Sequence, residues 1–304
     1  MSHLVAYFGN EPENLACALF SARGALYSKS APDGPSGQRT QRTNDGFGLG
    51  FVQGGDVLLR KRPRAETSEV DLYGLARDTR AEALVGRVGL APSVPAEAQA
   101  DAKSDASVRA EDADPFRFRS WLFGSISDVS ESAFEGVRER VLESTPSFLR
   151  RNIRGLSASE HIFHLFLAFL HDAGLLDQPT PPPTAVHVAL RNSLAFVDRL
   201  LVGSGAQSLK IALVATNGRC FVATGCAYPM RYLHVEGISD CPVCHAAQDR
   251  SDPQRSGRRV PHEALRAVVV EANRDVATRP SWIDIPDRSA LIVGADRQPI
   301  ISSL

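Results

Sequence analysis

The stretch NDGFGLGF, residues 44–51, passes from polar turn residues into an apolar run that is typical of a buried strand. A second strand-like run, DVLLR at residues 56–60, follows the short glycine-containing segment 53–55. Two such runs joined by a short connection that contains glycine predict a β-hairpin. We therefore expect an antiparallel sheet here, with Phe47–Phe51 and Asp56–Arg60 as neighbouring strands.

Further apolar runs on both sides of this hairpin predict a larger sheet structure. Leu209–Thr216 and Cys220–Thr224 are joined by Asn217-Gly218, a strong short-range hairpin signal. The other strand-like or aromatic segments are residues 4–8, 84–90, 116–126, 265–270 and 290–293. Apolar residues at helical spacing predict helices over 11–26, 131–142, 159–173 and 186–201. Together these segments indicate an α+β fold, two layers of strands with helices packed outside them.

The segment Ser159–Ala173 is the strongest helix candidate in the chain. Five large apolar residues recur in it at helical spacing: Ile162, Phe163, Phe166, Leu167 and Leu170. Ser157 and Glu160 precede this apolar face at the spacing of a capping box, which indicates where the helix begins.

The composition is that of an ordinary globular protein, with 43% hydrophobic residues, 23% charged residues and a net charge of −1. This balance of charge gives no indication of nucleic-acid binding. No apolar run approaches the ~20 residues of a membrane-spanning helix, and the opening residues lack a signal-peptide pattern, so we expect a cytoplasmic protein. We expect one domain over residues 1–304, with a mobile loop at 92–114 and a cysteine-containing loop at 226–260.

Four of the five cysteines lie close together in the sequence, within residues 220–244. Cys241 and Cys244 have the Cys-x-x-Cys spacing that lets two thiolates bind one tetrahedral metal ion, and His245 follows directly. We expect Cys226 as a further ligand, ahead of Cys220, so the candidate set for a structural zinc is Cys226, Cys241, Cys244 and His245. Reduced thiols or an occasional disulfide are the alternatives, and Cys17 is expected to be an ordinary core residue.

The order of these segments resembles the class II glutamine amidotransferases, in particular the small stand-alone branch related to the ergothioneine-pathway and glutathione-degradation amidohydrolases. The family opening Met-Cys-Arg-Leu-Leu-Ala-Tyr-x-Gly is similar to residues 1–9, MSHLVAYFG. The family's Asp-Gly-Trp-Gly pattern is similar to residues 45–48. Its Asn-x-His-Pro-Phe pattern and the Trp that follows it are similar to residues 112–116 and Trp121. Its Ser-Asp-(Ser/Thr)-Glu and Thr-Asp-Gly patterns are similar to residues 157–160 and 216–218. The resemblance implies an Ntn-hydrolase-like four-layer αββα sandwich of two antiparallel sheets with outer helices.

The resemblance also implies an amino-terminal nucleophile, oxyanion donors, a carboxylate-binding arginine and an ammonium-binding aspartate. Ser2 stands at the nucleophile position, and serine serves as a nucleophile in the wider superfamily. The arginine position holds Gly89, although Arg87 lies two residues away on the same expected strand face. The family's oxyanion motif aligns with Phe123–Ser127, where Ile126 stands in place of the motif's asparagine. The aspartate position holds Ala158. The remaining residues expected around this vestigial pocket are His3, Asp45, Gly46, Ser125 and Ser127.

These replacements predict a protein that has lost glutaminase activity and acts as a non-catalytic binding, scaffold or regulatory subunit. Its expected partner is another protein or a small molecule, without nucleic acid or membrane. The alternative is an amino-terminal-serine amidohydrolase in which Ser2 attacks an amide other than glutamine, with His3 as a possible base. A third hypothesis is a metal- or redox-responsive regulator that uses the cysteines.

Overall fold

The computed structural model describes residues 3–20, 47–62, 72–88, 113–244, 260–273 and 281–304. Within them the strands form two sheets in which every neighbouring pair is antiparallel. The seven-stranded sheet has, in spatial order, β11 (Ile283–Ile285), β9 (Met230–Ile238), β10 (His262–Ala272), β1 (His3–Gly9), β4 (Ala83–Val88), β2 (Phe47–Gln53) and β3 (Asp56–Arg62). The six-stranded sheet has β13 (Pro299–Ser303), β12 (Ser289–Val293), β8 (Phe221–Cys226), β7 (Ile211–Thr216), β6 (Trp121–Ser127) and β5 (Phe116–Phe118).

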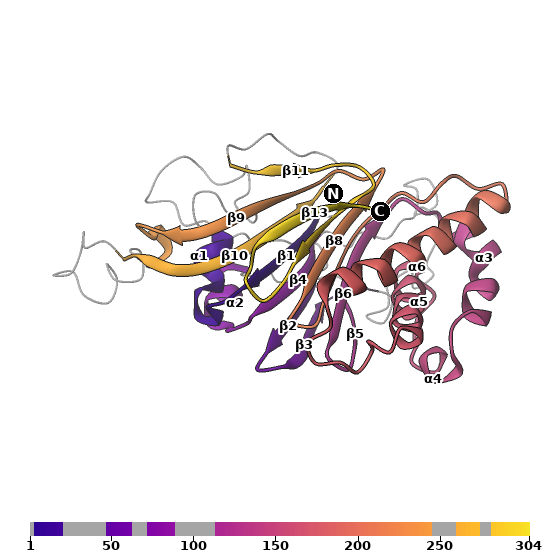
Figure 1. Cartoon of the computed structure of the whole chain (residues 1–304), viewed down its shortest axis with the longest axis horizontal. Helices are drawn as coiled ribbons and strands as arrows, with labels where there is room; N and C mark the ends of the chain where they lie inside the picture. The colour runs from indigo at the N-terminus through magenta and orange to yellow at the C-terminus, as the bar shows by residue number, and fades with distance from the viewer. Residues whose placement is uncertain (1–2, 21–46, 63–71, 89–112, 245–259, 274–280) are drawn as a thin grey trace, which may run out of the picture.

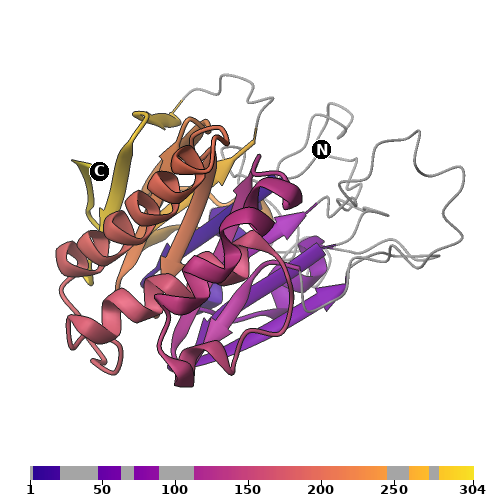
Figure 2. The same ribbon diagram turned by 90° about the vertical axis from the view of Figure 1, so that its right-hand side faces the viewer.

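Helices cover the outer face of each sheet, which gives four layers (Figures 1 and 2). The 3₁₀-helix η1 (Pro12–Asn14) leads into α1 (Leu15–Phe20), and α1 and α2 (Leu72–Asp78) pack on the seven-stranded sheet. The six-stranded sheet is covered by α3 (Glu131–Glu143), α4 (Ser147–Arg150), α5 (Ala158–Asp172) and α6 (Pro183–Gly203). The expected α+β sandwich of two antiparallel sheets with outer helices is confirmed.

Side chains alternate between the two faces of each strand, and β1 shows this directly. Leu4, Ala6 and Phe8 enter the apolar layer between the sheets, whereas Val5 and Tyr7 pack under α1 on the outer face. Phe8 stacks on Phe221 of the opposite sheet at a ring-centroid distance of 5.6 Å. Both faces of β1 are thus buried, which explains its nearly uninterrupted apolar sequence.

Helix α5 begins where the sequence predicts. The Ser157 side chain accepts a hydrogen bond from the backbone N–H of Glu160 at 3.2 Å. The Glu160 carboxylate accepts from the backbone N–H groups of Arg154 and Gly155, at 2.9 and 2.7 Å. The carboxylate therefore also fastens the loop before the helix, a contact that lies outside the two reciprocal bonds of a capping box.

One expected loop differs from the structure, and most of another lies outside the described residues. Strand β9 occupies Met230–Ile238 within the expected cysteine-containing loop 226–260, because this segment pairs with β10 along its length and buries Arg231 against Glu271. A charged residue within the segment hides the strand pattern from a reading of the sequence alone. Of the expected mobile loop 92–114, residues 92–112 lie outside the described residues, and Ala113 and Asp114 are buried.

The predicted helix over residues 11–26 begins as the η1 turn at Pro12 and continues as α1 to Phe20, with the rest outside the described residues. Among the described residues, no helix is long and apolar enough to span a membrane.

Candidate functional site

The described residues among those expected around the pocket lie at one end of the sandwich, where β1 and β2 begin and β4 and β6 end. Four of the expected residues, Ser2, Asp45, Gly46 and Gly89, lie outside the described residues. The described ones belong to two different faces of the seven-stranded sheet and to the six-stranded sheet. They therefore form two groups, one between the sheets and one on the outer face.

The first group lies between the sheets and centres on Asp114, which is 1% exposed. One carboxylate oxygen, Oδ2, lies 2.8 Å from Nη1 of Arg87 on β4. The other, Oδ1, accepts a hydrogen bond from the backbone N–H of Ser125 on β6 at 2.7 Å. Because Arg87 and Ser125 belong to different sheets, Asp114 joins the two sheets through charged hydrogen bonds.

Ser125 extends this network toward the helical layer. Its Oγ lies 2.6 Å from Oγ of Ser159 in α5 and 3.4 Å from Oδ1 of Asp114. Ser125 and Ser159 are both buried. The hydroxyl at position 125 is thus engaged within the protein core.

Close approach of the backbone is a condition for this network. A Cβ atom on Gly48 of β2 would lie 1.8 Å from the carbonyl oxygen of Asp114. Only glycine lets the strand pass that close, so the glycine of the motif at residues 45–48 has a direct steric role.

The neighbouring pocket positions carry apolar side chains. Ile126 is 3% exposed and packs in the core between the sheets, in the same apolar cluster as Leu4 and Val214. Ala158 is the first residue of α5 and packs against the core under the helices. Ser127 ends β6 and is partly exposed.

The second group lies on the outer face of the seven-stranded sheet and contains His3. Its Nε2 atom lies 3.6 Å from the Glu271 carboxylate, which binds Arg231 at 2.5 Å. The guanidinium of Arg231 also lies over the Trp282 ring, 5.6 Å from its centroid. His3 shares this face with Val5 and Tyr7, so it points away from the layer that holds Arg87 and Ile126.

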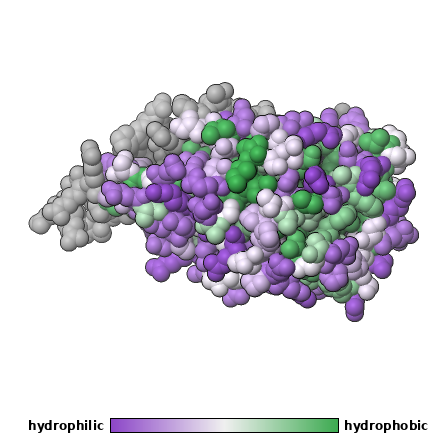
Figure 3. Space-filling view, in the orientation of Figure 1, coloured by the Kyte–Doolittle hydropathy of each residue, from purple (hydrophilic) through white to green (hydrophobic). Residues whose placement is uncertain are grey.

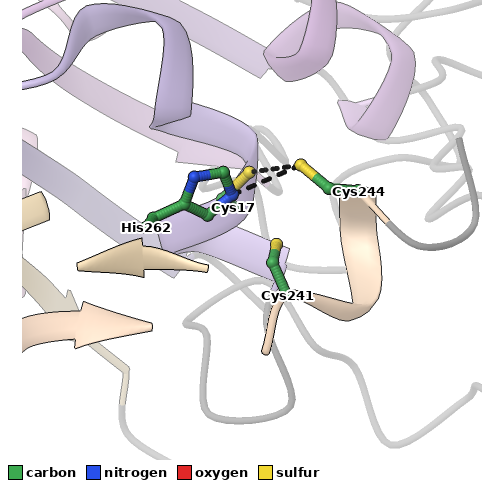
Figure 4. A group of neighbouring side chains, drawn as sticks. All are labelled: Cys17, Cys241, Cys244 and His262. Carbon is green, nitrogen blue, oxygen red and sulfur yellow. Dashed lines mark hydrogen bonds between the residues drawn. The ribbon is translucent and has the colours of Figure 1, made fainter. Parts of the chain in front are cut away.

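The cysteines and one histidine form a third group at the opposite end of the seven-stranded sheet. Ligand atoms of Cys17, Cys241, Cys244 and His262 all lie within 4.8 Å of one another. Figure 4 shows these four side chains pointing toward one another, with Cys17 in α1 and His262 at the start of β10. Such a set of three thiols and one imidazole can hold a metal ion.

This arrangement changes the expected ligand set. Cys241 and Cys244 are in the cluster as predicted, but Cys226 ends β8 in the core of the other sheet, because strand pairing with β7 and β12 turns it under the helices. Cys17, expected to be an ordinary core residue, is a member of the cluster. His245 lies outside the described residues, and the described histidine of the cluster is His262.

Among the three cysteines of the cluster, the pKa of Cys241 alone is lowered, whereas those of Cys17 and Cys244 are raised. A hydrogen bond from the Cys17 thiol lowers the pKa of Cys241, and the same contact raises the pKa of Cys17. Burial raises the pKa of Cys226 to about 11 and that of Cys220 to about 12. Since metals bind the thiolate, Cys241 is the cysteine of the cluster that most readily supplies one, while burial keeps the core thiols Cys220 and Cys226 protonated.

Recognition in the sequence that β9 and β10 pair with each other would have predicted His262 as a ligand. The backbone N–H of Cys241 donates to the carbonyl of Val260 at 3.1 Å, so the residues that flank this connection meet. Pairing of these strands therefore brings His262 beside the Cys-x-x-Cys segment. Cys17 has no such local signal, because its approach depends on the packing of α1 on the sheet.

The layers and strand pairing define the class of fold: a four-layer αββα sandwich of the Ntn-hydrolase-like kind. Solved structures place this fold more narrowly. A glutamine aminotransferase class-II domain protein from Silicibacter pomeroyi matches 99% of this chain and 98% of its own, with a TM-score of 0.56 and 14% identity. The chain therefore has the fold of a class II glutamine amidotransferase domain.

Two further structures are similar over nearly the whole chain at a TM-score of 0.48. One is a predicted glutamine amidotransferase from Pseudomonas aeruginosa, at 12% identity and with 98% of this chain and 95% of that chain covered. The other is glutamine phosphoribosylpyrophosphate amidotransferase from B. subtilis, at 11% identity and with 99% of this chain and 49% of that chain covered. No family model and no curated protein sequence matches the chain.

Proposed function

We propose that this protein is a class II glutamine amidotransferase-like protein that does not hydrolyse glutamine and acts by binding a partner protein or a small molecule. The observation that carries the proposal is the closed network of Arg87, Asp114 and Ser125. Arg87 and Ser125 lie beside the positions where the resemblance expects substrate-binding groups. Both instead form hydrogen bonds with Asp114 inside the protein.

Arg87 lies two residues from the expected carboxylate-binding position, and its charge is already balanced by Asp114. The Asp114 carboxylate is buried, and Arg87 itself is 21% exposed at its side chain. A substrate carboxylate that drew Arg87 away would leave Asp114 charged and unpaired in the core, which is strongly unfavourable. Arg87 is therefore a poor substitute for the carboxylate-binding arginine, whose position is occupied by Gly89.

The expected oxyanion donor is also missing from its position. Ile126 has no hydrogen-bonding side chain, and it is buried in the apolar layer between the sheets. Loss of one such donor typically costs ~2.7–4 kcal/mol of transition-state stabilisation. Alanine at position 158 likewise leaves the substrate ammonium without its expected partner, so both replacements argue against glutamine hydrolysis.

The residues that keep the family pattern have structural contacts instead. Trp121 Nε1 donates to the carbonyl of Leu176 at 3.2 Å, and its ring meets Phe166 edge-on. Glu160 accepts two backbone hydrogen bonds, and Gly48 allows the close approach of Asp114. The resemblance thus survives where it supports the fold and fails where the family performs chemistry.

Edge strand β13 offers a surface for a protein partner. It is the last strand of the six-stranded sheet in the described part of the chain, and its Ile300 and Ile301 side chains are 59% and 40% exposed. Figure 3 shows apolar side chains gathered over this part of the molecule. An exposed apolar edge favours an extended partner segment that adds as a further strand.

The test compares amide turnover by the wild-type protein and by Ser2→Ala. Intact mass first establishes whether Met1 is removed, since an amino-terminal nucleophile requires a processed terminus. Ammonia or amine release is then followed with glutamine, γ-glutamyl amides and other amides. We expect no release by the wild type above the level of Ser2→Ala.

Turnover by a processed wild type that Ser2→Ala abolishes would contradict the proposal. It would instead support the alternative, an amino-terminal-serine hydrolase with a rebuilt pocket. In that case His3 is a poor candidate for the base in this conformation, because it faces Glu271 on the outer side of the sheet.

A further inference from the structure

Four potential metal ligands come together from parts of the chain that are far apart in the sequence. Cys17 belongs to α1, Cys241 follows β9, Cys244 lies in the short helical segment that starts at Pro242, and His262 is the first residue of β10. All four side chains turn toward a common point in Figure 4. No disulfide joins the cysteines of the cluster, and Cys17 and Cys241 are almost fully buried.

The spacing of the ligand atoms fits one tetrahedral ion. With Zn–S near 2.3 Å and Zn–N near 2.05 Å, tetrahedral ligands stand roughly 3.8 Å (S to S) and 3.6 Å (S to N) apart. In the structure Cys17 Sγ and Cys244 Sγ are 3.5 Å apart, and Cys244 Sγ is 3.3 Å from His262 Nε2. The remaining ligand-atom pairs are no more than 4.8 Å apart. Shifts of less than 1.5 Å, roughly, would bring all four atoms to the tetrahedral distances.

The ligand types select the metal. Three thiolates and one imidazole in tetrahedral arrangement are typical of structural zinc sites, while hard ions such as Mg²⁺ and Ca²⁺ prefer oxygen ligands. Four protein ligands leave no open position for water or substrate, which distinguishes a structural from a catalytic site.

We propose that Cys17, Cys241, Cys244 and His262 form a structural Zn²⁺ site that fastens α1 to the connection between β9 and β10. This inference does not depend on the proposed function. His262 and Glu271 stand nine residue steps apart on β10, which places the site up to roughly 30 Å from the His3–Glu271 contact. The metal would therefore hold the fold and would take no part in chemistry at the amino terminus.

The position of the site explains what the ion would stabilise. The described residues of α1, Leu15–Phe20, pack on side chains of β1 and β10. A bond from Cys17 to the β9–β10 connection adds a crosslink between the amino-terminal and carboxy-terminal parts of the sheet. Zinc removal should lower the melting temperature and expose the thiols of the cluster to alkylation.

A disulfide between Cys17 and Cys244 is the competing arrangement. Their sulfur atoms are 3.5 Å apart, beyond the ~2.05 Å of a disulfide bond, and Cys241 and His262 would then have no common partner. The two arrangements differ in mass and in metal content, so the same sample distinguishes them.

The experiment measures the metal content of the full-length protein, purified under reducing conditions after growth with zinc. We expect one zinc per chain. After exchange for Co²⁺, we expect the intense visible bands of a tetrahedral site and sulfur-to-cobalt charge-transfer absorption. Cys17→Ala and Cys244→Ala should lose the metal, and His262→Cys should keep it, because four thiolates also form a zinc site.

Cys226→Ala is the matched control, since it removes a buried cysteine outside the cluster and should retain the full metal content. The wild-type cobalt spectrum keeps the test valid even if a ligand variant fails to fold. Three results would overturn the proposal: a folded wild type with five titratable thiols that binds neither Zn²⁺ nor Co²⁺, metal loss in Cys226→Ala equal to that in Cys17→Ala, or a native disulfide between Cys17 and Cys244.

Discussion

Gly48 lets strand β2 pass close to the backbone of Asp114. Its α-carbon faces the Asp114 carbonyl so closely that an added Cβ would lie 1.8 Å from that oxygen. The obstacle is backbone, which cannot rotate away as a side chain could. We predict that Gly48→Ala destabilises the protein by about 3 kcal/mol, measured by urea unfolding.

Gly136 is the matched control for this substitution. It lies within α3, and an added Cβ would meet nothing within 4 Å. Gly136→Ala should stabilise the protein by roughly 0.5–1 kcal/mol, because alanine restricts the unfolded chain and favours a helix. Equal effects of the two substitutions would contradict the steric role of Gly48.

The Arg87–Asp114 pair yields the second prediction at the scale of single residues. Arg87→Met leaves a buried carboxylate without its cation, which should cost roughly 3 kcal/mol of unfolding free energy. Adding Asp114→Asn removes the uncompensated charge, so the double variant should be more stable than Arg87→Met. A double-mutant cycle in denaturant measures this coupling, and strictly additive losses would show that the pair does not act as a unit.

At the scale of one element, helix α5 carries a buried histidine in its apolar face. His164 is 2% exposed, its Nδ1 lies 2.9 Å from the Glu160 carbonyl oxygen, and its Nε2 has no hydrogen-bond partner among the described residues. Burial lowers the pKa of His164 from 6.5 to about 4. The folded protein therefore keeps this ring neutral through a pH range in which the unfolded chain binds a proton.

The sign of the resulting pH dependence follows from proton binding. Below pH 6.5 the unfolded state takes up a proton that the folded state takes up only near pH 4, so stability is full above pH 6.5 and falls toward pH 4. At pH 5 the loss should be about 2 kcal/mol. We predict that His164→Leu reduces the fall in unfolding free energy between pH 7 and pH 5 by that amount. An unchanged pH dependence in His164→Leu would contradict this account of the buried ring.

The elements show how far the sequence alone predicts the fold. Ser157 and the apolar spacing of Ile162 to Leu170 determine α5 locally, and the Asn217-Gly218 turn determines the β7–β8 hairpin, so both are confirmed. The local sequence does not predict strand β9, because what stabilises it is pairing with β10 and the buried Arg231–Glu271 ion pair. Local patterns predict turns and amphipathic faces, but they do not predict which distant strand supplies the ion-pair partner of a buried charged residue.

The same limit explains the metal ligands. Cys241 and Cys244 are predicted by their own spacing, whereas Cys17 reaches them only through the packing of α1 on β1 and β10. Cys226 looked equivalent to them in sequence because it is near, but it ends a strand of the other sheet. Nearness in sequence is a poor guide to a metal site that joins separate elements.

At the scale of the whole molecule, the sandwich is closed on its outer faces by helices and has an apolar edge at β13. If that edge binds a partner strand, a charge on it should interfere without affecting the fold. We predict that Ile300→Lys weakens binding to a partner purified from native cells and reconstituted as a complex, while the melting temperature stays unchanged. Val202→Lys, which changes an equally exposed apolar residue of α6, is the control, and equal binding by both variants would exclude the β13 edge.

The chain has the amidotransferase fold, and we propose that it lacks the glutaminase chemistry. The most direct measurement is the rate of ammonia release from glutamine by wild-type protein whose Met1 has been removed, relative to Ser2→Ala. We predict equal rates, at the background of the uncatalysed reaction, because Arg87 is held by Asp114 and Ile126 offers no oxyanion donor. A wild-type rate well above that of Ser2→Ala would show a working active site and contradict the claim.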